Sequence, residues 1–281
     1  GEGASLTGAL GEDAMARTVG ALRVCSNKLK WWNVGRVRLI ATEACRMAAN
    51  GPDFVRRVQE ETGLALEIID RETEARLAVA GAAPLIAPTA RHVLIFDIGG
   101  GSTELMWLSV EAGRHRIEAW TSIPAGVVTL AEQFGGVSVD EATFEAMRRH
   151  VRPLMQAFAG RAAATVGIAG PDHLLGTSGT VTTICGVQLG LRRYDRARVD
   201  GCWIKGQDVG DVTGRLLGMS FEERAQSPCI GRERADLVLG GCAILEEIRA
   251  IWPAEWLRVA DRGLREGLLA HMMIEDGCYG R

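Results

Sequence analysis

Several features that would place a chain in a simple class are missing from this sequence. No apolar run approaches the roughly 18 residues that a membrane-spanning helix requires, so the sequence predicts no such helix. The first residues, Gly1-Glu2-Gly3, show no basic stretch followed by an apolar core, and no signal peptide is indicated in them. We therefore expect a cytoplasmic protein without a membrane partner.

Cysteine and histidine occur without the spacing that a metal site or a disulfide framework needs. The seven cysteines are odd in number and scattered, and they include no C-x-x-C pair, which favours reduced thiols in a protein core. The five histidines form no metal-ligand cluster, and we interpret each as a surface or locally satisfied side chain. These patterns argue against a zinc site and against a disulfide-stabilised protein.

An excess of positive charge is also missing. The formal net charge is −3, which argues against a nucleic-acid partner, although a local basic groove can still bind a polyanion. Lys28, Lys30 and Lys205 are the only lysines among 32 basic residues. Arginine suits phosphate because its planar fork binds oxygens bidentately. Genomic base composition can produce the same excess of arginine, so both interpretations stay open.

The second half of the chain has a clear order of predicted elements. Short apolar runs predict strands, and periodic apolar positions predict helices. In chain order these are strands over residues 91–97, 104–110 and 116–123, helices over 127–134 and 141–158, a strand over 173–175, helices over 181–189 and 233–252, a strand over 256–260 and a helix over 264–274. Asp140 is the expected N-cap of the helix over 141–158. A three-strand meander followed by βα units is the order of a ribonuclease-H-like domain, so an α/β fold is predicted.

The first half of the chain resembles the end of the same order. It predicts a helix over residues 13–31, a strand over 37–41, a helix over 52–62, a strand over 66–69 and a helix over 72–80. Pro52 fits the first turn of the middle helix, and Gly63 fits its C-terminal cap. No three-strand meander precedes these elements. We expect roughly fifty further residues before Gly1 in the intact protein, since three strands and their turns need about that many.

An internal repeat supports two copies of one unit. Asp70-Arg71 follows the strand predicted over 66–69, and Asp261-Arg262 follows the strand predicted over 256–260. Each pair stands between a strand and a helix. Such a match can arise by chance, but the shared order of elements favours a duplication. We predict two domains, residues 1–88 and 89–281, divided in the proline-bearing segment 83–89.

The strongest motif is the stretch Asp97-Ile98-Gly99-Gly100-Gly101-Ser102-Thr103-Glu104. Three consecutive glycines in a hairpin turn leave backbone N–H groups bare, so they can hold a phosphate. Ser102 and Thr103 add hydroxyl donors. Asp97 and Glu104 supply hard oxygen ligands suited to magnesium or calcium. An ordinary hairpin needs only one or two glycines and no carboxylates beside them, so the motif indicates a phosphate and metal site.

Three further motifs each allow a structural and a functional interpretation. In Glu72-Thr73-Glu74-Ala75-Arg76, Glu72 could favour the start of a helix through its dipole, and Glu74 could polarise a water. In Gly176-Thr177-Ser178-Gly179-Thr180, the turn could supply anion donors at a helix N-terminus, or Ser178 or Thr180 could simply cap that helix. In Ala41-Thr42-Glu43-Ala44-Cys45-Arg46, Arg46 could reach a phosphate or lie in solvent.

Taken in this order, the motifs resemble those of the exopolyphosphatase / guanosine pentaphosphate phosphatase family across essentially the whole chain. The matching stretches are residues 40–46 with Asn50, 67–77, 97–104, 123–127, 176–180, 194–196 with 199–201, and 264–267. The glycine loop alone would also admit actin-like ATPases and sugar kinases. The resemblance is to the short form of the family. It implies two ribonuclease-H-like domains of the actin-like ATPase superfamily with a cleft between them, of which the first lacks its opening strands here.

The resemblance also implies roles for the candidate residues. Glu74 matches the glutamate proposed as general base, and Arg46 matches an arginine near the phosphates. Asp97 and Glu104 match acidic residues associated with the metal ion. The second phosphate-binding loop of the family is matched by Gly99, Gly100, Gly101, Ser102 and Thr103, and Ser178 joins these phosphate-binding candidates from its own motif. The family's first phosphate loop, an Asp-x-Gly-x-Asn/Ser turn, is not found in this sequence.

The reaction implied is hydrolysis of a terminal phosphoanhydride with Mg²⁺ or another divalent cation. Inorganic polyphosphate is the leading substrate, and guanosine pentaphosphate is the alternative. A sugar kinase or ATPase is disfavoured because the turn over 176–179 is short for an adenosine site. A sensor that binds polyphosphate or an alarmone without turnover stays open. A homodimer is also considered, and Trp31-Trp32 is either a partner surface or part of the core.

Overall fold

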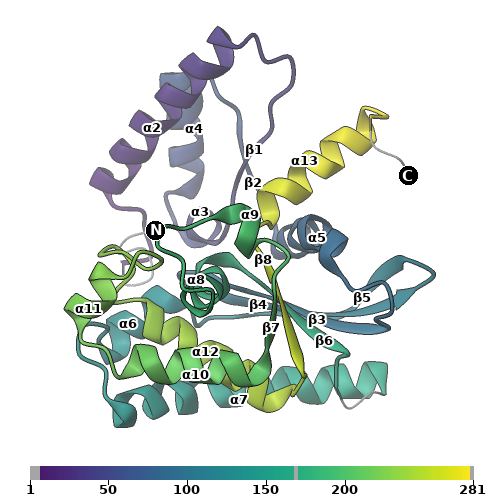
Figure 1. Ribbon diagram of the computed structural model, residues 1–281. Coiled ribbons are helices and arrows are strands. Elements are labelled where there is room, and N and C mark those ends of the chain that lie inside the picture. The colour runs from purple at the N-terminus through teal and green to yellow at the C-terminus, as the bar shows by residue number, and fades with distance from the viewer. Residues whose placement is uncertain (1–6, 168–169, 279–281) are drawn as a thin grey trace. The chain divides into compact units, whose positions relative to one another are not determined.

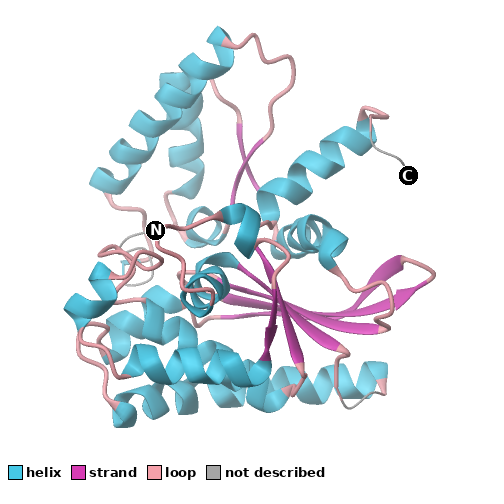
Figure 2. Cartoon of the chain, in the orientation of Figure 1, coloured by secondary structure: helices cyan, strands magenta, loops and turns pink. Residues whose placement is uncertain are grey.

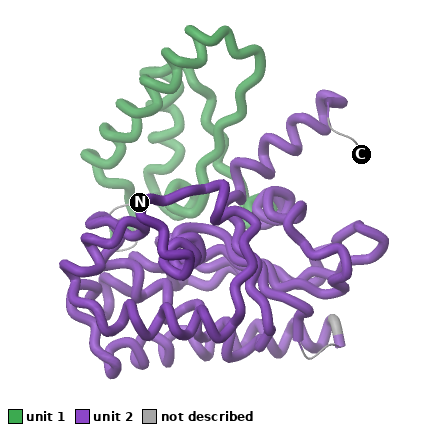
Figure 3. Tube along the Cα trace, viewed as in Figure 1, with its two compact units in different colours: residues 1–74 green, residues 75–281 purple. Residues whose placement is uncertain are grey.

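The computed structural model describes residues 7–167 and 170–278. Its internal contacts divide the chain into two compact units, residues 1–74 and residues 75–281, which are coloured separately in Figure 3. The division falls inside one helix. Because it is based on contacts within the chain, it does not test the domain boundary predicted at residues 88/89, which stays a prediction. Within the described ranges, no helix is long and apolar enough to cross a membrane.

The first unit is built from helices around a small parallel sheet. Its elements are α2 (Glu12–Trp31), β1 (Leu39–Ala41), α3 (Glu43–Met47), α4 (Gly51–Thr62), β2 (Leu66–Ile68) and the first turn of α5 (Arg71–Ala82). Leu39 of β1 lies opposite Leu66 of β2 in parallel register. Helix α4 has a proline in its first turn and ends at Gly63 with a left-handed φ of 72°, as predicted.

The apolar core of this unit is small. It contains Leu10, Val19, Ala48, Phe54, Val58 and Leu64. Trp31 and Trp32 stand outside it with 79% and 70% of their surface exposed, so the interpretation of this pair as core residues is wrong. Helix α3, which brings Glu43 and Arg46 onto one short turn, was not predicted.

The second unit contains a mixed sheet covered by helices, shown in Figure 2. After α5 and the 3-10 turn η1 (Ala83–Leu85), its elements are β3 (His92–Ile98), β4 (Thr103–Glu111), β5 (Arg114–Ile123), α6 (Val127–Phe134), α7 (Glu141–Val166), β6 (His173–Thr177), α8 (Ser178–Gln188), α9 (Arg196–Val199), β7 (Trp203–Lys205), α10 (Gly206–Leu217), α11 (Phe221–Gln226), α12 (Val238–Ile251), β8 (Trp256–Ala260) and α13 (Leu264–Glu275). The strand order is β5-β4-β3-β6-β8-β7. Strands β3, β6 and β8 are parallel, and β4, β5 and β7 pair antiparallel to their neighbours.

This order confirms the predicted ribonuclease-H-like arrangement and adds β7 as an edge strand. Alternation along the strands sends side chains to two faces. Leu94 and Phe96 of β3 pack with α7, α8 and α12 in the larger core, while Val93 and Ile95 pack with α5 in a smaller one. Figure 1 shows α7, α10 and α12 on one side of the sheet and α5 on the other. Because both faces of β3 are buried, its sequence reads as a continuous apolar run.

A capping residue determines where α7 begins, but other helix boundaries differ from the predicted ones. Asp140 accepts a hydrogen bond of 2.8 Å from the Thr143 N–H and starts α7 as predicted, but α7 continues to Val166 rather than ending at Phe158. The helix predicted from residue 233 begins only at Val238.

A buried arginine explains why the helix begins late. The Arg224 guanidinium is only 2% exposed and donates to the Ala235 carbonyl at 2.9 Å and to the Met219 carbonyl at 2.6 Å. The segment before α12 is therefore held as a turn by a contact from elsewhere in the chain. The periodicity of the sequence contains no record of that contact.

Two glycines let α5 and α13 cross with their backbones in contact. A Cβ atom added to Gly81 would lie 2.0 Å from the Gly263 carbonyl oxygen, and one added to Gly267 would lie 1.8 Å from the Leu77 carbonyl oxygen. No real Cβ atom tolerates such distances, so the crossing requires glycine at both positions.

Candidate functional site

The predicted phosphate loop is the turn between β3 and β4. The Gly99 N–H donates to the Ser102 carbonyl at 2.9 Å and closes the turn. The first N–H groups of α6 hold the loop from outside, with Val127 donating to the Gly99 carbonyl at 3.0 Å and Val128 donating to the Gly100 carbonyl at 2.8 Å. A Cβ atom on Gly126 would lie 2.5 Å from both of these carbonyl oxygens, so the loop seats on α6 only through a glycine there.

The loop leaves backbone donors open. Within the described part of the chain, the N–H groups of Gly100, Gly101 and Ser102 make no hydrogen bond. None of Gly99, Gly100 and Gly101 has a left-handed φ, so conformational freedom is not what requires glycine here. What glycine supplies is bare backbone that an anion can approach closely.

A row of polar residues crosses the sheet beside the loop. Glu104 of β4 lies opposite Asp97 of β3, and Asp97 lies opposite Thr177 of β6. On the other side, Glu104 lies opposite Ser122 of β5. Residues in direct register point to the same face of a sheet, so Ser122, Glu104, Asp97 and Thr177 form one polar row. Ser122 and Ser102 donate to Glu104 Oε1 at 2.9 and 2.6 Å.

The Asp97 carboxyl of this row has a perturbed pKa. Burial raises its pKa, and the nearby Thr177 and Ser178 hydroxyls act in the opposite direction without cancelling the rise. A cation beside the carboxylate would compensate for the lost solvation. Mg²⁺ is commonly bound through one or two carboxylates together with waters and substrate phosphates, and the two hard oxygen ligands Asp97 and Glu104 fit that demand. No group of three or more metal-binding side chains occurs among residues 7–167 and 170–278.

Two predicted phosphate ligands have other partners. Thr103 is fully buried, and its hydroxyl donates to the Ala125 carbonyl at 2.7 Å. The Ser178 hydroxyl donates to the Ile98 carbonyl at 2.6 Å, and Ser178 has a left-handed φ of 74°, which is uncommon for a residue other than glycine. Ser178 thus joins the end of β3 to the start of α8. Phosphate binding by these two residues stays a prediction.

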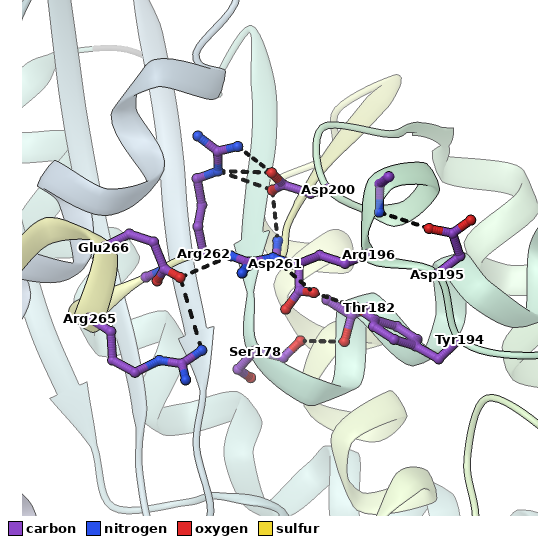
Figure 4. A network of polar contacts seen from close by, with 12 residues as sticks. Ser178, Thr182, Tyr194, Asp195, Arg196, Asp200, Asp261, Arg262, Arg265 and Glu266 are labelled. Carbon is purple, nitrogen blue, oxygen red and sulfur yellow. Dashed lines mark hydrogen bonds and ion pairs between the residues drawn. The ribbon is translucent and has the colours of Figure 1, made fainter. Parts of the chain in front are cut away.

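Figure 4 shows a polar network that follows from Ser178 toward α13. The Thr182 hydroxyl donates to the Ser178 carbonyl at 3.1 Å. Further along, Tyr194 donates to Asp261 at 2.6 Å, and Arg196 donates to Glu266 at 2.9 Å. The sequence marked the stretches 194–196, 199–201 and 264–267 only by resemblance.

A second group of candidates lies in the first unit. Arg46 Nη1 donates to Glu74 Oε2 at 3.1 Å and to the Ile69 carbonyl at 2.7 Å, and Nη2 pairs with Glu43. The side chains of Arg46 and Glu74 are each 19% exposed. Glu43 also pairs with Arg71 at 2.7 Å. Arg46 is therefore held between two carboxylates rather than lying free in solvent.

Glu74 has an environment suited to a base. Burial raises its pKa, the hydrogen bond and charge of Arg46 lower it, and the charge of Glu43 raises it. The net shift is upward. A general base works best when its pKa approaches the operating pH, and this shift moves Glu74 in that direction.

Sequence reasoning missed the residues that position Glu74. Asp70 caps α5, with its Oδ1 accepting from the Thr73 N–H at 2.7 Å, and Glu72 lies in the first turn of the helix as predicted. An Asp three residues before a Thr at the end of a strand is a readable capping signal. Glu43 became visible as a partner of Arg46 only through α3, because a five-residue helix has too little periodicity to be predicted.

The fold and the predicted phosphate loop are those expected of a phosphatase with the actin-like ATPase fold, and the comparisons agree. The family model described as the Ppx/GppA phosphatase family matches residues 1–275, and this chain belongs to that family. The chain is 30% identical over 256 residues to Exopolyphosphatase 2 of Mycobacterium tuberculosis. This match covers 88% of the chain and 77% of that protein.

Solved structures extend the match to the fold. The crystal structure of the Aquifex aeolicus Ppx/GppA family member has a TM-score of 0.80 at 28% identity, over 98% of this chain and 86% of that one. An exopolyphosphatase from Cytophaga hutchinsonii has a TM-score of 0.84 over 97% of this chain and 85% of that one. Its 22% identity supports the fold alone. The predicted fold class and family are thereby confirmed.

Proposed function

We propose that this protein is an exopolyphosphatase that releases terminal phosphate from inorganic polyphosphate by hydrolysis. The observation that supports this most is the Gly99–Ser102 turn, whose three open N–H groups lie beside the carboxylates of Asp97 and Glu104. Membership of a phosphatase family and the name of the Mycobacterium tuberculosis relative support the same substrate class.

In this proposal the loop binds the terminal phosphate. The N–H groups of Gly100, Gly101 and Ser102 donate to its oxygens, and they stabilise charge as it develops because they are fixed in advance by α6. Asp97 and Glu104 would hold Mg²⁺. When bound, the cation offsets the negative charge of the phosphate oxygens. Phosphoryl transfer needs mostly positioning and electrostatics, so no covalent intermediate is required.

Glu74 is proposed as the general base. A water attacks the terminal phosphorus, and its proton passes to the Glu74 carboxylate as the bridging P–O bond breaks. The products are inorganic phosphate and a chain shorter by one phosphate. Arg46 orients Glu74 through their 3.1 Å hydrogen bond, and its charge opposes the rise in the pKa of Glu74 that burial causes. Arg46 also contributes positive charge where the substrate is anionic.

The deciding experiment measures phosphate release with magnesium from long polyphosphate and from guanosine pentaphosphate side by side. We expect a clear preference for polyphosphate. Preference for the nucleotide would overturn the proposed substrate and keep the proposed chemistry. Tight binding of polyphosphate without release of phosphate would overturn the chemistry and leave a sensor. Homodimer formation and a cytoplasmic location stay predictions.

A further inference from the structure

An aromatic cavity lies at the other end of the strands that lead to the phosphate loop. Strand β6 runs from His173 to Thr177, and β8 runs from Trp256 to Ala260. The phosphate loop adjoins the end of β6, because Thr177 is in register with Asp97. The cavity adjoins the start of both strands. It has a volume of about 430 Å³ and is lined by His173, Trp256, Trp203 of β7, Asp172, Ala87, Thr89 and Ala90.

The cavity has the size and lining of a small-molecule site. Ligand pockets typically span about 300–1,000 Å³ and combine apolar walls with a few polar groups. Trp203 lies edge to face with His173, with ring centroids 5.0 Å apart, and edge to face with Trp256 at 6.4 Å. The interplanar angles are 80° and 79°. Two indoles at nearly right angles form a corner in which a flat ring can stack on one and meet the edge of the other.

Cations flank both tryptophans. The Arg258 guanidinium lies 4.6 Å from the Trp203 ring centroid, and Lys205 Nζ lies 5.6 Å from that of Trp256. Arg258 Nε is buried without a hydrogen-bond partner in the described structure. A buried unpaired donor on a cation is costly to leave unmet, and this one lies directly behind the aromatic wall. An anionic group on a ligand would complement the positive charge of Lys205, which is exposed beside Trp256.

The polar wall supplies acceptors. Asp172 Oδ2 accepts from the Arg91 and His92 N–H groups at 2.6 and 2.8 Å. Burial opposes ionisation of Asp172, but these hydrogen bonds outweigh it and lower its pKa, so the carboxylate is charged. His173 Nε2 accepts from the Ala87 N–H at 3.3 Å, which leaves its proton on Nδ1, 3.0 Å from the Leu174 carbonyl. His173 is therefore a neutral aromatic wall, and Asp172 is the acceptor for N–H groups of a ligand.

We propose that this cavity binds a nucleoside phosphate. The base stacks against the indoles of Trp203 and Trp256, its N–H edge faces Asp172, and the phosphate lies near Lys205. The site is separate from the phosphate loop and does not depend on the proposed hydrolysis. An aliphatic ligand would not use the aromatic corner.

The test uses the full chain labelled with 5-fluorotryptophan and observed by ¹⁹F NMR. Each of the seven tryptophan signals is assigned by its Trp→Phe variant. We expect ADP and GDP to shift the Trp203 and Trp256 signals and to leave the Trp31 and Trp32 signals in place. Tripolyphosphate, which has the charge without the base, should not shift the cavity signals. Overturning results are unchanged Trp203 and Trp256 signals at millimolar nucleotide, or equal shifts with tripolyphosphate.

Calorimetry on variants measures the contribution of stacking. Trp256→Ala should weaken ADP binding by about 5- to 150-fold, as expected for the loss of one stacked aromatic ring. Trp120→Phe is the matched control, because Trp120 is a tryptophan at 36% exposure on the distant strand β5, and it should bind ADP as the parent does. Trp256→Phe keeps an aromatic ring and should retain most of the parent's affinity for ADP. It therefore separates the loss of stacking from poor folding of Trp256→Ala. Equal affinity in Trp256→Phe, Trp256→Ala and the parent would overturn the proposal. Shifts of the Trp203 signal that depend on protein concentration without nucleotide would show a second copy covering the cavity instead.

Discussion

Two segments of the chain have the same order of a strand, an Asp-Arg pair and a helix, but the side chains of the two segments make different contacts. In both, the arginine pairs with an acid from an earlier segment, Arg71 with Glu43 and Arg262 with Asp200. Asp70 caps its helix, whereas Asp261 accepts from Tyr194 and the second helix is capped by Glu266 at the Gly263 N–H.

The difference between the copies is largest at the position of Glu74. Counting from the Asp-Arg pair, the residue that corresponds to Glu74 in the second copy is Arg265, which is 85% exposed. The neighbouring acid Glu266 is held by Arg196 and by the Gly263 N–H. The two segments thus share an arginine–acid pair, and of the two acids Glu74 and Glu266 only Glu74, at 19% exposure, has a raised pKa.

The largest expected effect comes from removing that acid. Glu74→Gln should lower the turnover number for polyphosphate by about 10²- to 10⁴-fold, the usual loss when a general base is removed. The measurement is steady-state phosphate release. Glu266→Gln is the matched control in the second copy, and it should lower the urea midpoint while turnover stays within a few-fold of the parent. Equal losses of turnover in both variants would remove the distinction between the copies.

A second variant tests whether phosphate binding belongs to the β3–β4 loop rather than to either repeated segment. Gly126→Ala would push a methyl group into the Gly99 and Gly100 carbonyls at 2.5 Å. Displacing the loop should cost up to about 100-fold in kcat/KM, as small misplacements of binding groups do. Gly160→Ala is the control, since nothing lies within 4 Å of a Cβ atom there. Unchanged kinetics in Gly126→Ala would contradict the seating of the loop on α6.

The pH dependence of turnover should distinguish Arg46 from Arg71, the two arginines that pair with Glu43. Glu74 must be ionised to act as a base, and burial raises its pKa, so activity should fall at a higher pH than the ordinary glutamate value of about 4.3. Arg46 opposes that rise. Arg46→Gln should therefore move the acidic limb of the pH–rate profile to still higher pH. Arg71→Gln should leave the limb in place, because Arg71 pairs with Glu43, and a common shift in both variants would argue against a specific Arg46–Glu74 pairing.

The smallest effects concern stability. Arg262→Met should lower the free energy of unfolding by about 1.5–3 kcal/mol, because its partner Asp200 is largely buried with a side-chain exposure of 13%. Arg71→Met should cost about 0–1 kcal/mol, since the exposures of Arg71 and Glu43 are 45% and 30%. Urea denaturation measures both, and a larger loss in Arg71→Met would invert the comparison.

The sign of the pH effect on the Arg262–Asp200 pair follows from Asp200. Burial disfavours its ionisation, but hydrogen bonds from Arg262 and from the Asp261 N–H outweigh this and lower its pKa. An acid with a lowered pKa in the folded state stabilises the fold above its unfolded pKa, and that stabilisation is lost as pH falls through the folded value. The difference between the parent and Arg262→Met should therefore shrink below about pH 4.

The sequence was informative where local signals determine structure. Asp140 starts α7, Gly63 ends α4, and the apolar run of β3 marks a strand buried on both faces. The five-residue helix α3 was missed because it spans little more than one helical turn, and the three-residue strand β7 and the helix α10 were also not predicted. The late start of α12 depends on a side-chain hydrogen bond from Arg224 to the Ala235 carbonyl, which the apolar periodicity of the sequence does not record.

Some features of the candidate site can likewise be predicted from the sequence, and others cannot. The glycine loop and the position of Glu74 at the start of a helix can be predicted, since residue type and spacing define them. The pairing of Arg46 with Glu43 and Glu74 cannot, because it depends on how α3, β2 and α5 pack. The register that aligns Ser122, Glu104, Asp97 and Thr177 also arises only when four strands assemble.

The glycine crossing of α5 and α13 restricts how this sequence can diverge. Positions 81 and 267 face backbone carbonyls at 2.0 and 1.8 Å, so even alanine at one of them would force the helices apart. A compensating change at the other position cannot restore the contact, since glycine is already the smallest residue. We therefore expect these two positions to resist substitution for reasons of space, independently of any effect on catalysis.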